Sequence, residues 1–147
     1  MSGTGSTSIP DVPVRDVWER LRADAGAVLI DVRTEAELAY VGHPDLSPIG
    51  KRLVTSEWQT YPDQRVDAGF VEKLSRRLGQ LGADHSSNLY FICRSGARSL
   101  SAARAMHAAG YTKSHNVADG FEGPLDVKRH RGLVAGWKAA GLPWAQG

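Results

Sequence analysis

Apolar residues along this chain follow two patterns, which predict strands and helices in alternation. Residues 27–32 and 88–93 are short, almost continuous apolar runs, and such runs are typical of strands buried on both faces of a sheet. Shorter strands are expected at residues 52–55 and 114–118.

Helical spacing of apolar residues marks two longer segments between these strands. The first covers residues 13–22, and the second ends at Gly82 after about four turns of an amphipathic helix. Their apolar faces consist of Val14, Val17, Trp18 and Leu21 in the first segment, and Val66, Phe70, Leu74, Leu78 and Leu81 in the second.

Three further helices are expected from end signals. Thr34 followed by Glu37 is a capping-box pattern, which starts a short helix at Glu35–Tyr40. The other two helices are expected at residues 99–109 and 132–140, each followed directly by a glycine.

The alternation of strands and helices predicts a three-layer α/β domain with a mainly parallel sheet. We assign this domain to residues 10–147 and expect a flexible tail, rich in Ser, Thr and Gly, at residues 1–9. A length of 147 residues fits one domain with a core of its own.

Charge and composition narrow the classes of function. The net charge of +2 argues against nucleic-acid binding, and no apolar run is long enough to span a membrane. The first residues lack the pattern of a signal peptide, so we expect a cytoplasmic protein. One cysteine excludes a disulfide within the chain.

The charge is uneven along the chain. Residues 88–117 contain no Asp or Glu, but they include Arg94, Arg98, Arg104 and Lys113. A locally positive site predicts a small anionic substrate.

The segment Cys93-Arg-Ser-Gly-Ala-Arg-Ser99 joins the second apolar strand to the Ala-rich helix. Backbone N–H groups in such a loop converge on one anion-sized spot at the positive end of the helix dipole, and Gly96 supplies a position where φ can be positive. These donors, together with Arg94 and Arg98, favour a Cys93 thiolate. The alternative is an inert buried cysteine, but two guanidinium groups beside a thiol favour a catalytic or anion-binding role.

Several segments together resemble the rhodanese domain across residues 10–144. They are Leu29-Ile-Asp-Val-Arg33 with Glu35, the Cys93 loop, Ala109-Gly-Tyr111, Asn116-Val, Asp119-Gly-Phe-Glu-Gly123, Gly136-Trp, and Ala140-Gly-Leu-Pro-Trp144. The resemblance implies a five-stranded parallel sheet and a thiosulfate sulfurtransferase-type enzyme. In that family the loop cysteine accepts sulfane sulfur from an anionic donor as a persulfide and passes it to cyanide or a thiol.

The resemblance also implies roles for individual residues. Cys93 is the nucleophile and persulfide carrier, and no bound cofactor is needed. The cradle around the sulfur comes from the backbone N–H groups of Arg94, Ser95, Gly96, Ala97, Arg98 and Ser99. The Arg94 and Arg98 side chains face the entrance, and the Ser99 hydroxyl donates a hydrogen bond to the sulfur.

Three residues outside the loop are weaker candidates for the pocket. Asp31 and Arg33 match the family's strand-end pair, with either a pocket role or a structural salt bridge for Arg33. Trp58 is a candidate for the pocket mouth, because residues 42–50 depart from the usual rhodanese sequence; the alternative is packing on the core. The basic stretch 128–131 is either a solvated surface or a docking site for an acidic partner, and a protein sulfur donor or acceptor is a further candidate partner.

Loop length separates two related activities. Four residues lie between Cys93 and Arg98, whereas phosphatases on a rhodanese-like fold have five, so the tighter ring favours a sulfur atom over a phosphoryl group. A third hypothesis is a persulfide relay module with little turnover of small donors. The five histidines lie apart and outside metal-ligand spacing, so we expect no metal.

Overall fold

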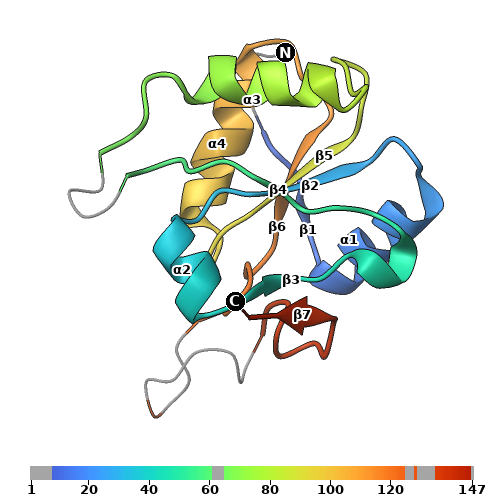
Figure 1. Cartoon of the computed structure of the whole chain (residues 1–147), viewed down its shortest axis with the longest axis vertical. Helices are drawn as coiled ribbons and strands as arrows, with labels where there is room; N and C mark the ends of the chain where they lie inside the picture. Colours follow the sequence, from blue (N-terminus) through green and yellow to red (C-terminus); the bar gives the residue numbers. More distant parts are fainter. Residues whose placement is uncertain (1–7, 61–64, 125–127, 129–134, 147) are drawn as a thin grey trace.

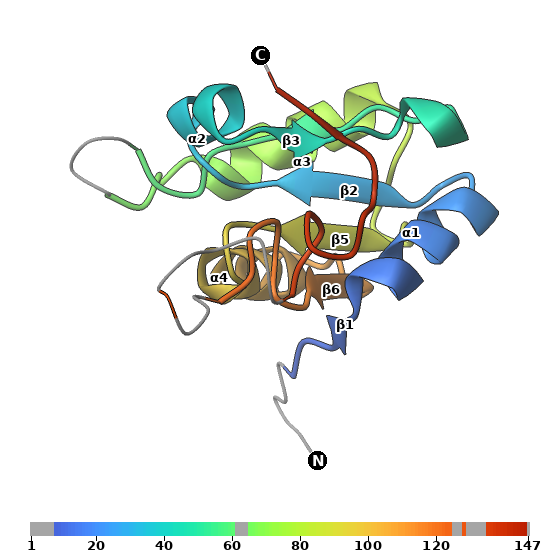
Figure 2. The same ribbon diagram turned by 90° about the horizontal axis from the view of Figure 1, so that it is seen from below.

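The computed structural model describes residues 8–60, 65–124, 128 and 135–146. Its centre is a five-stranded sheet in which every neighbouring pair is parallel, as the sequence predicted. The strand order is β1 (Asp11–Val12), β6 (Ser114–Val117), β5 (Leu89–Ile92), β2 (Val28–Asp31) and β4 (Val54–Thr55). Figure 2 shows β2, β5 and β6 side by side in this order.

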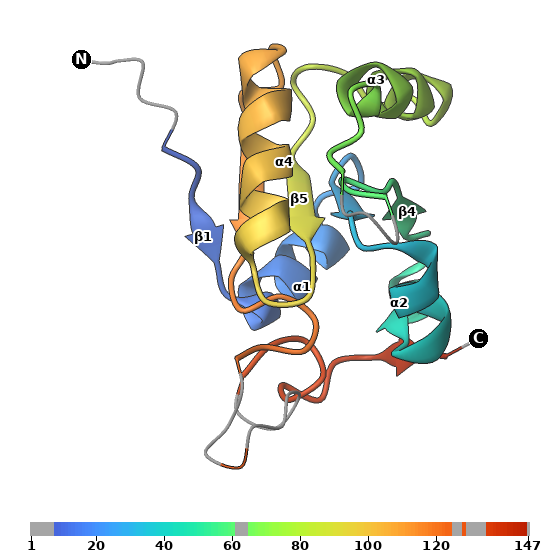
Figure 3. The ribbon, with the colours of Figure 1, turned by 90° about the vertical axis from the view of Figure 1, so that its left-hand side faces the viewer.

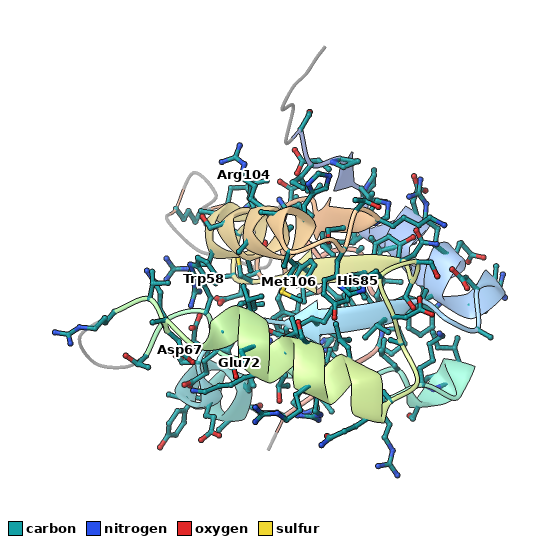
Figure 4. All side chains as sticks on the ribbon, turned by 90° about the horizontal axis from the view of Figure 1, so that it is seen from above. Trp58, Asp67, Glu72, His85, Arg104 and Met106 are labelled. Atoms are coloured by element: carbon teal, nitrogen blue, oxygen red, sulfur yellow. The ribbon has the colours of Figure 1, made fainter. Side chains whose placement is uncertain are left out.

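Helices cover both faces of the sheet and bury two apolar clusters (Figure 1). Helix α1 (Val14–Ala23) packs on one face, and α3 (Phe70–Gln80) and α4 (Ala97–Ala108) pack on the other. Met106 is fully buried and lies between α4 and α3 in Figure 4. The three-layer α/β prediction is therefore confirmed.

Helix α2 (Glu35–Tyr40) follows β2 and carries the predicted capping box between Thr34 and Glu37. A 3₁₀ turn, η1 (Ser47–Ile49), follows it. The small strands β3 (His43–Pro44) and β7 (Trp144–Ala145) then pair antiparallel, which brings the C-terminal segment beside α2 (Figure 3). The sequence did not predict this pair, because two-residue strands with proline have no readable periodicity.

Two predicted helix boundaries were wrong. Helix α3 begins at Phe70 rather than at Val66, which is 46% exposed and forms an antiparallel bridge with Gln59. The Asp67 carboxylate accepts the Gly69 N–H, and this turn sets the later start of the helix. Helix α4 begins at Ala97, two residues earlier than expected, because Gly96 directs the chain into the helix.

The last predicted helix, 132–140, is wrong where the structure describes it. Residues 135–140 form turns, and residues 129–134 lie outside the described residues. Gly136 has φ +99°, and the Trp137 and Lys138 N–H groups donate to the Gly120 and Phe121 carbonyls, so the one helical hydrogen bond here, from the Ala140 N–H to the Gly136 carbonyl, is not continued into a helix.

Ile9, the last residue of the predicted tail, is buried in the core cluster, whereas residues 1–7 lie outside the described part of the chain. Among the described residues, no helix combines the length and apolar character needed to cross a bilayer.

Candidate active site

Cys93 lies directly after β5, at the carboxyl end of the parallel sheet, and its side chain is only 1% exposed. Gly96 takes φ +119°, which turns its N–H toward the sulfur at an N–Sγ distance of 3.2 Å. The next N–H groups, of Ala97 and Arg98, open α4 and have no carbonyl to bind within the helix. The loop therefore directs backbone donors and the positive end of a helix dipole at Sγ.

A turn beneath the loop fixes its backbone. Phe121 donates its N–H to the Cys93 carbonyl at 2.8 Å, and Glu122 donates to the Arg94 carbonyl at 2.9 Å. Gly120 lies so close that a Cβ there would be 2.5 Å from the Cys93 carbonyl oxygen. The Asp119-Gly-Phe segment thus supports the position of Cys93.

A cavity of about 440 Å³ opens above Cys93. Its walls come from α2, from the segment after β4, and from the loop itself. They consist of Thr34, Ala36, Glu37, Gln59, Thr60, Cys93, Arg94, Ser95, Ala97 and Arg98.

Glu37 and Arg98 form a bidentate ion pair on the cavity wall. The Nη1–Oε1 and Nη2–Oε2 distances are 2.7 and 2.8 Å, and the Thr34 N–H and hydroxyl also bind Glu37 Oε1. The charge of Arg98 is thereby balanced, whereas exposed Arg94 has no carboxylate partner among the residues described. Sequence reasoning noted Glu37 only as a helix cap and missed its second role.

Because of this ion pair, we expect the folded protein to lose part of its stability in acid. Burial acts to raise the pKa of the Glu37 carboxyl, but hydrogen bonds and charge from Arg98 and bonds from Thr34 outweigh it and lower the pKa from 4.5 to about 2. Because the folded pKa is depressed, the contribution is complete above pH 4.5 and is lost as the pH falls to about 2. We expect Glu37→Gln to remove this part of the pH dependence, measured as urea midpoints from neutral pH downward.

The control for this measurement is Glu72→Gln on the exposed face of α3, where Arg76 approaches only to 3.6 Å. A plot of its urea midpoint against pH should stay parallel to the plot for the unmodified protein. A Glu37→Gln curve that is also parallel below pH 4.5 would contradict the assignment.

Asp31 and Arg33 lie outside the cavity and form a structural pair. Both side chains are fully buried and 2.8 Å apart, and Arg33 also donates to the Gly42 carbonyl at 2.8 Å. Its guanidinium carbon lies 4.4 Å from the ring centre of Phe121, a cation–π contact. The pair therefore anchors the segments around the loop, and its burial favours the structural salt bridge over a pocket role for Arg33.

Trp58 also lies outside the cavity lining, and the structure favours the alternative in which it packs on the core. Its ring packs edge-on against Phe70 with centroids 5.0 Å apart, at the start of α3 (Figure 4). The next two residues, Gln59 and Thr60, form that wall instead. A large aromatic ring gains more by packing on the core than by remaining at an open cavity.

Ser99 lies where the prediction placed it, with its Oγ 3.2 Å from Cys93 Sγ. Ser99 Oγ also lies close to the Gly96 carbonyl and to the Asn116 amide, and sequence reasoning did not assign Asn116 to the site. In the described part of the chain, no three His, Cys, Asp or Glu side chains gather as a metal would require. Of the basic stretch, Lys128 is described and exposed, and residues 129–131 lie outside the described residues.

Comparison with known proteins agrees with this architecture. The family model described as the STR4 middle domain matches residues 11–147. An uncharacterised protein of Rickettsia rickettsii is 32% identical over 93% of this chain and 98% of its own length. The rhodanese-like domain-containing protein 4 of Arabidopsis thaliana is 25% identical over 90% of this chain. The match covers 25% of the length of that protein.

The crystal structure of Rv0390 from M. tuberculosis superposes with a TM-score of 0.82 at 43% identity, over 94% of this chain and 98% of that one. The fold, the cysteine loop after β5 and these matches agree. The chain belongs to the rhodanese-like family, in the group described as the STR4 middle domain.

Proposed function

We propose that this protein is a sulfurtransferase that carries sulfane sulfur on Cys93. The observation that carries the proposal is the setting of Sγ, which lies at the bottom of an open cavity with the Gly96 N–H 3.2 Å away and the start of α4 beside it. This setting stabilises negative charge on the cysteine sulfur and on one further atom attached to it.

The first step transfers sulfur to the enzyme. The Cys93 thiolate attacks the outer sulfur of thiosulfate, a new Sγ–S bond forms as the donor S–S bond breaks, and sulfite leaves with the bonding electron pair. The persulfide then carries the negative charge on its outer sulfur. The N–H groups of Ala97 and Arg98 are placed to bind that charge, because they have no intrahelical acceptors.

The second step returns the thiolate. Cyanide or a thiolate attacks the outer sulfur, and the Sγ–S electron pair returns to Cys93 as thiocyanate or a new persulfide leaves. Arg94 is the cation that attracts anionic donors, because Glu37 already balances Arg98.

Phosphate hydrolysis is the weaker alternative. It needs a protonated acid for the leaving oxygen, but the carboxyl on the cavity wall is Glu37, whose pKa of about 2 keeps it ionised at neutral pH. Asp119 is not part of the lining and lies in the supporting turn with φ +63°.

Mass spectrometry of the intact protein tests the proposal. After incubation with thiosulfate we expect the mass of one added sulfur atom, and cyanide should remove that mass and release thiocyanate. Turnover of an aryl phosphate with inhibition by vanadate would instead support a phosphatase. Loading only from a protein persulfide, and not from thiosulfate, would support the relay module.

A further inference from the structure

A chain of side-chain hydrogen bonds runs from the catalytic sulfur to the edge of the sheet. Ser99 Oγ lies 3.2 Å from Cys93 Sγ and 2.5 Å from Asn116 Oδ1. Asn116 Nδ2 in turn donates to Asp11 Oδ1 at 2.9 Å and to the Gly96 carbonyl at 3.2 Å. Ser99 and Asn116 are buried, at 0% and 4% exposure, so water cannot readily substitute for these partners.

The orientation of the Asn116 amide follows from its neighbours. The Asp11 carboxylate and the Gly96 carbonyl are both acceptors, so the NH₂ group must face them. The amide oxygen therefore faces the Ser99 hydroxyl. Two oxygens 2.5 Å apart need a hydrogen between them, and only Ser99 has one to give.

The Ser99 hydroxyl has one hydrogen and three acceptors within reach, namely Sγ, the Gly96 carbonyl and Asn116 Oδ1. Asn116 Oδ1, the nearest of the three, accepts that hydrogen. The oxygen lone pairs of Ser99 then face Cys93 Sγ. They can accept a hydrogen bond from a thiol S–H, but they repel a thiolate.

We infer that Asn116 is a positioning residue that holds the Ser99 hydrogen away from Sγ and so favours an inner sulfur without charge. That sulfur is the bridging sulfur of the persulfide during turnover. The Gly96 N–H and the start of α4 still stabilise the thiolate, but Ser99 adds nothing to this unless its hydrogen leaves Asn116.

The consequence for sulfur transfer follows from the position of the charge. When the Cys93 thiolate displaces sulfite from thiosulfate, the negative charge moves from Sγ to the outer sulfur, toward the opening of α4. The Ser99 hydrogen then returns to Asn116 at no electrostatic cost. Asn116 thus shifts the equilibrium toward the persulfide, and Asp11 acts by holding the amide.

The other charges around the sulfur are left in place when Asn116 is replaced. Arg94 and Arg98 belong to the loop, Glu37 belongs to α2 and acts through Arg98, and the Asp31–Arg33 pair belongs to β2. Of the groups named, only Asp11 on β1 contacts Asn116 directly.

Alkylation by iodoacetamide tests this inference, which rests on the proposed function but can fail separately because alkylation needs no sulfur transfer. We expect Asn116→Leu to move the pH profile of Cys93 alkylation to lower pH and to raise the rate at pH 6 about fivefold, since the freed Ser99 hydroxyl can donate to the thiolate. At a fixed ratio of thiosulfate to sulfite, the ratio of persulfide to thiolate should fall by the same factor.

Ser99→Ala supplies the second measurement, with Asn116 intact. If Asn116 holds the hydroxyl hydrogen, this variant should alkylate at nearly the unmodified rate, whereas in the Asn116→Leu background it should slow alkylation about fivefold. The matched control is Asn88→Leu, which removes an Asn–Asp contact to Asp24 before β5 and should leave alkylation unchanged.

Two results would overturn the inference. One is a clear slowing of alkylation by Ser99→Ala alone, which would mean that Ser99 already donates to the sulfur. The other is additive effects of the two substitutions, which would mean that Asn116 does not act through Ser99. If Asn116→Leu fails to fold, the alkylation rate of Ser99→Ala alone still tests the inference.

Discussion

Cys93→Ser is expected to abolish persulfide formation and to lower cyanide-dependent turnover at least about a thousandfold. A serine hydroxyl is not ionised at neutral pH and cannot hold a sulfane sulfur as a persulfide does. The fold should remain, because serine fits the space of a buried cysteine and can still accept the Gly96 N–H. Intact-mass spectrometry after thiosulfate treatment and thiocyanate release measure the two effects.

A thermal unfolding midpoint close to that of the unmodified protein is the control for Cys93→Ser, since it separates loss of chemistry from loss of structure. Ser95→Ala is a matched substitution on the same cavity wall, where an exposed hydroxyl is removed without touching the sulfur. It should load sulfur normally. If Cys93→Ser retained full turnover, the sulfur would have to pass through another group and the proposed function would be wrong.

The parts of the site that the sequence predicted are contiguous in the chain. Cys93, Gly96 and Ser99 belong to one loop between a strand and a helix, so their mutual position follows from local geometry. The Gly96 N–H beside the sulfur, the positive φ of Gly96 and the nearness of Ser99 to the sulfur all follow from this local geometry.

The parts that sequence analysis missed come from distant segments. Glu37 is 61 residues before Arg98, and Asn116 is 17 residues after Ser99. Their contacts exist because β2, β5 and β6 end at the same edge of the parallel sheet, and no spacing along the chain encodes which side chains meet there. The same limit explains why Trp58 was considered for the cavity and Gln59, which lines it, was not.

The fold errors have a related cause. Val66 fits the helical period of α3, but its backbone pairs with Gln59 and so leaves the helix. Residues 135–140 resemble a helix in composition, yet Gly136 and Trp137 are held by Gly120. In both cases a tertiary contact overrides local propensity.

Gly120→Ala is expected to have the second largest effect, on both stability and turnover. Its φ of +63° disfavours a side chain, and an added Cβ would lie 2.5 Å from the Cys93 carbonyl oxygen and 2.7 Å from the Arg94 carbonyl. Because these neighbours are backbone atoms, the loop must shift. We expect a loss of about 2–4 kcal/mol in unfolding free energy and about a hundredfold lower turnover from misplacement of Sγ, measured by urea unfolding and thiocyanate release.

Gly50→Ala separates strain from displacement. Gly50 has nearly the same φ, +69°, but nothing lies within 4 Å of the added Cβ. The unfolding free energy of Gly50→Ala should therefore fall only by the strain of a left-handed alanine, about 1 kcal/mol, and turnover should be unchanged. The excess effect of Gly120→Ala then measures how firmly the Phe121 and Glu122 N–H groups hold the loop backbone. If both variants kept full turnover, the turn beneath the loop would not position Cys93, and the catalytic geometry would have to come from the strand and α4 alone.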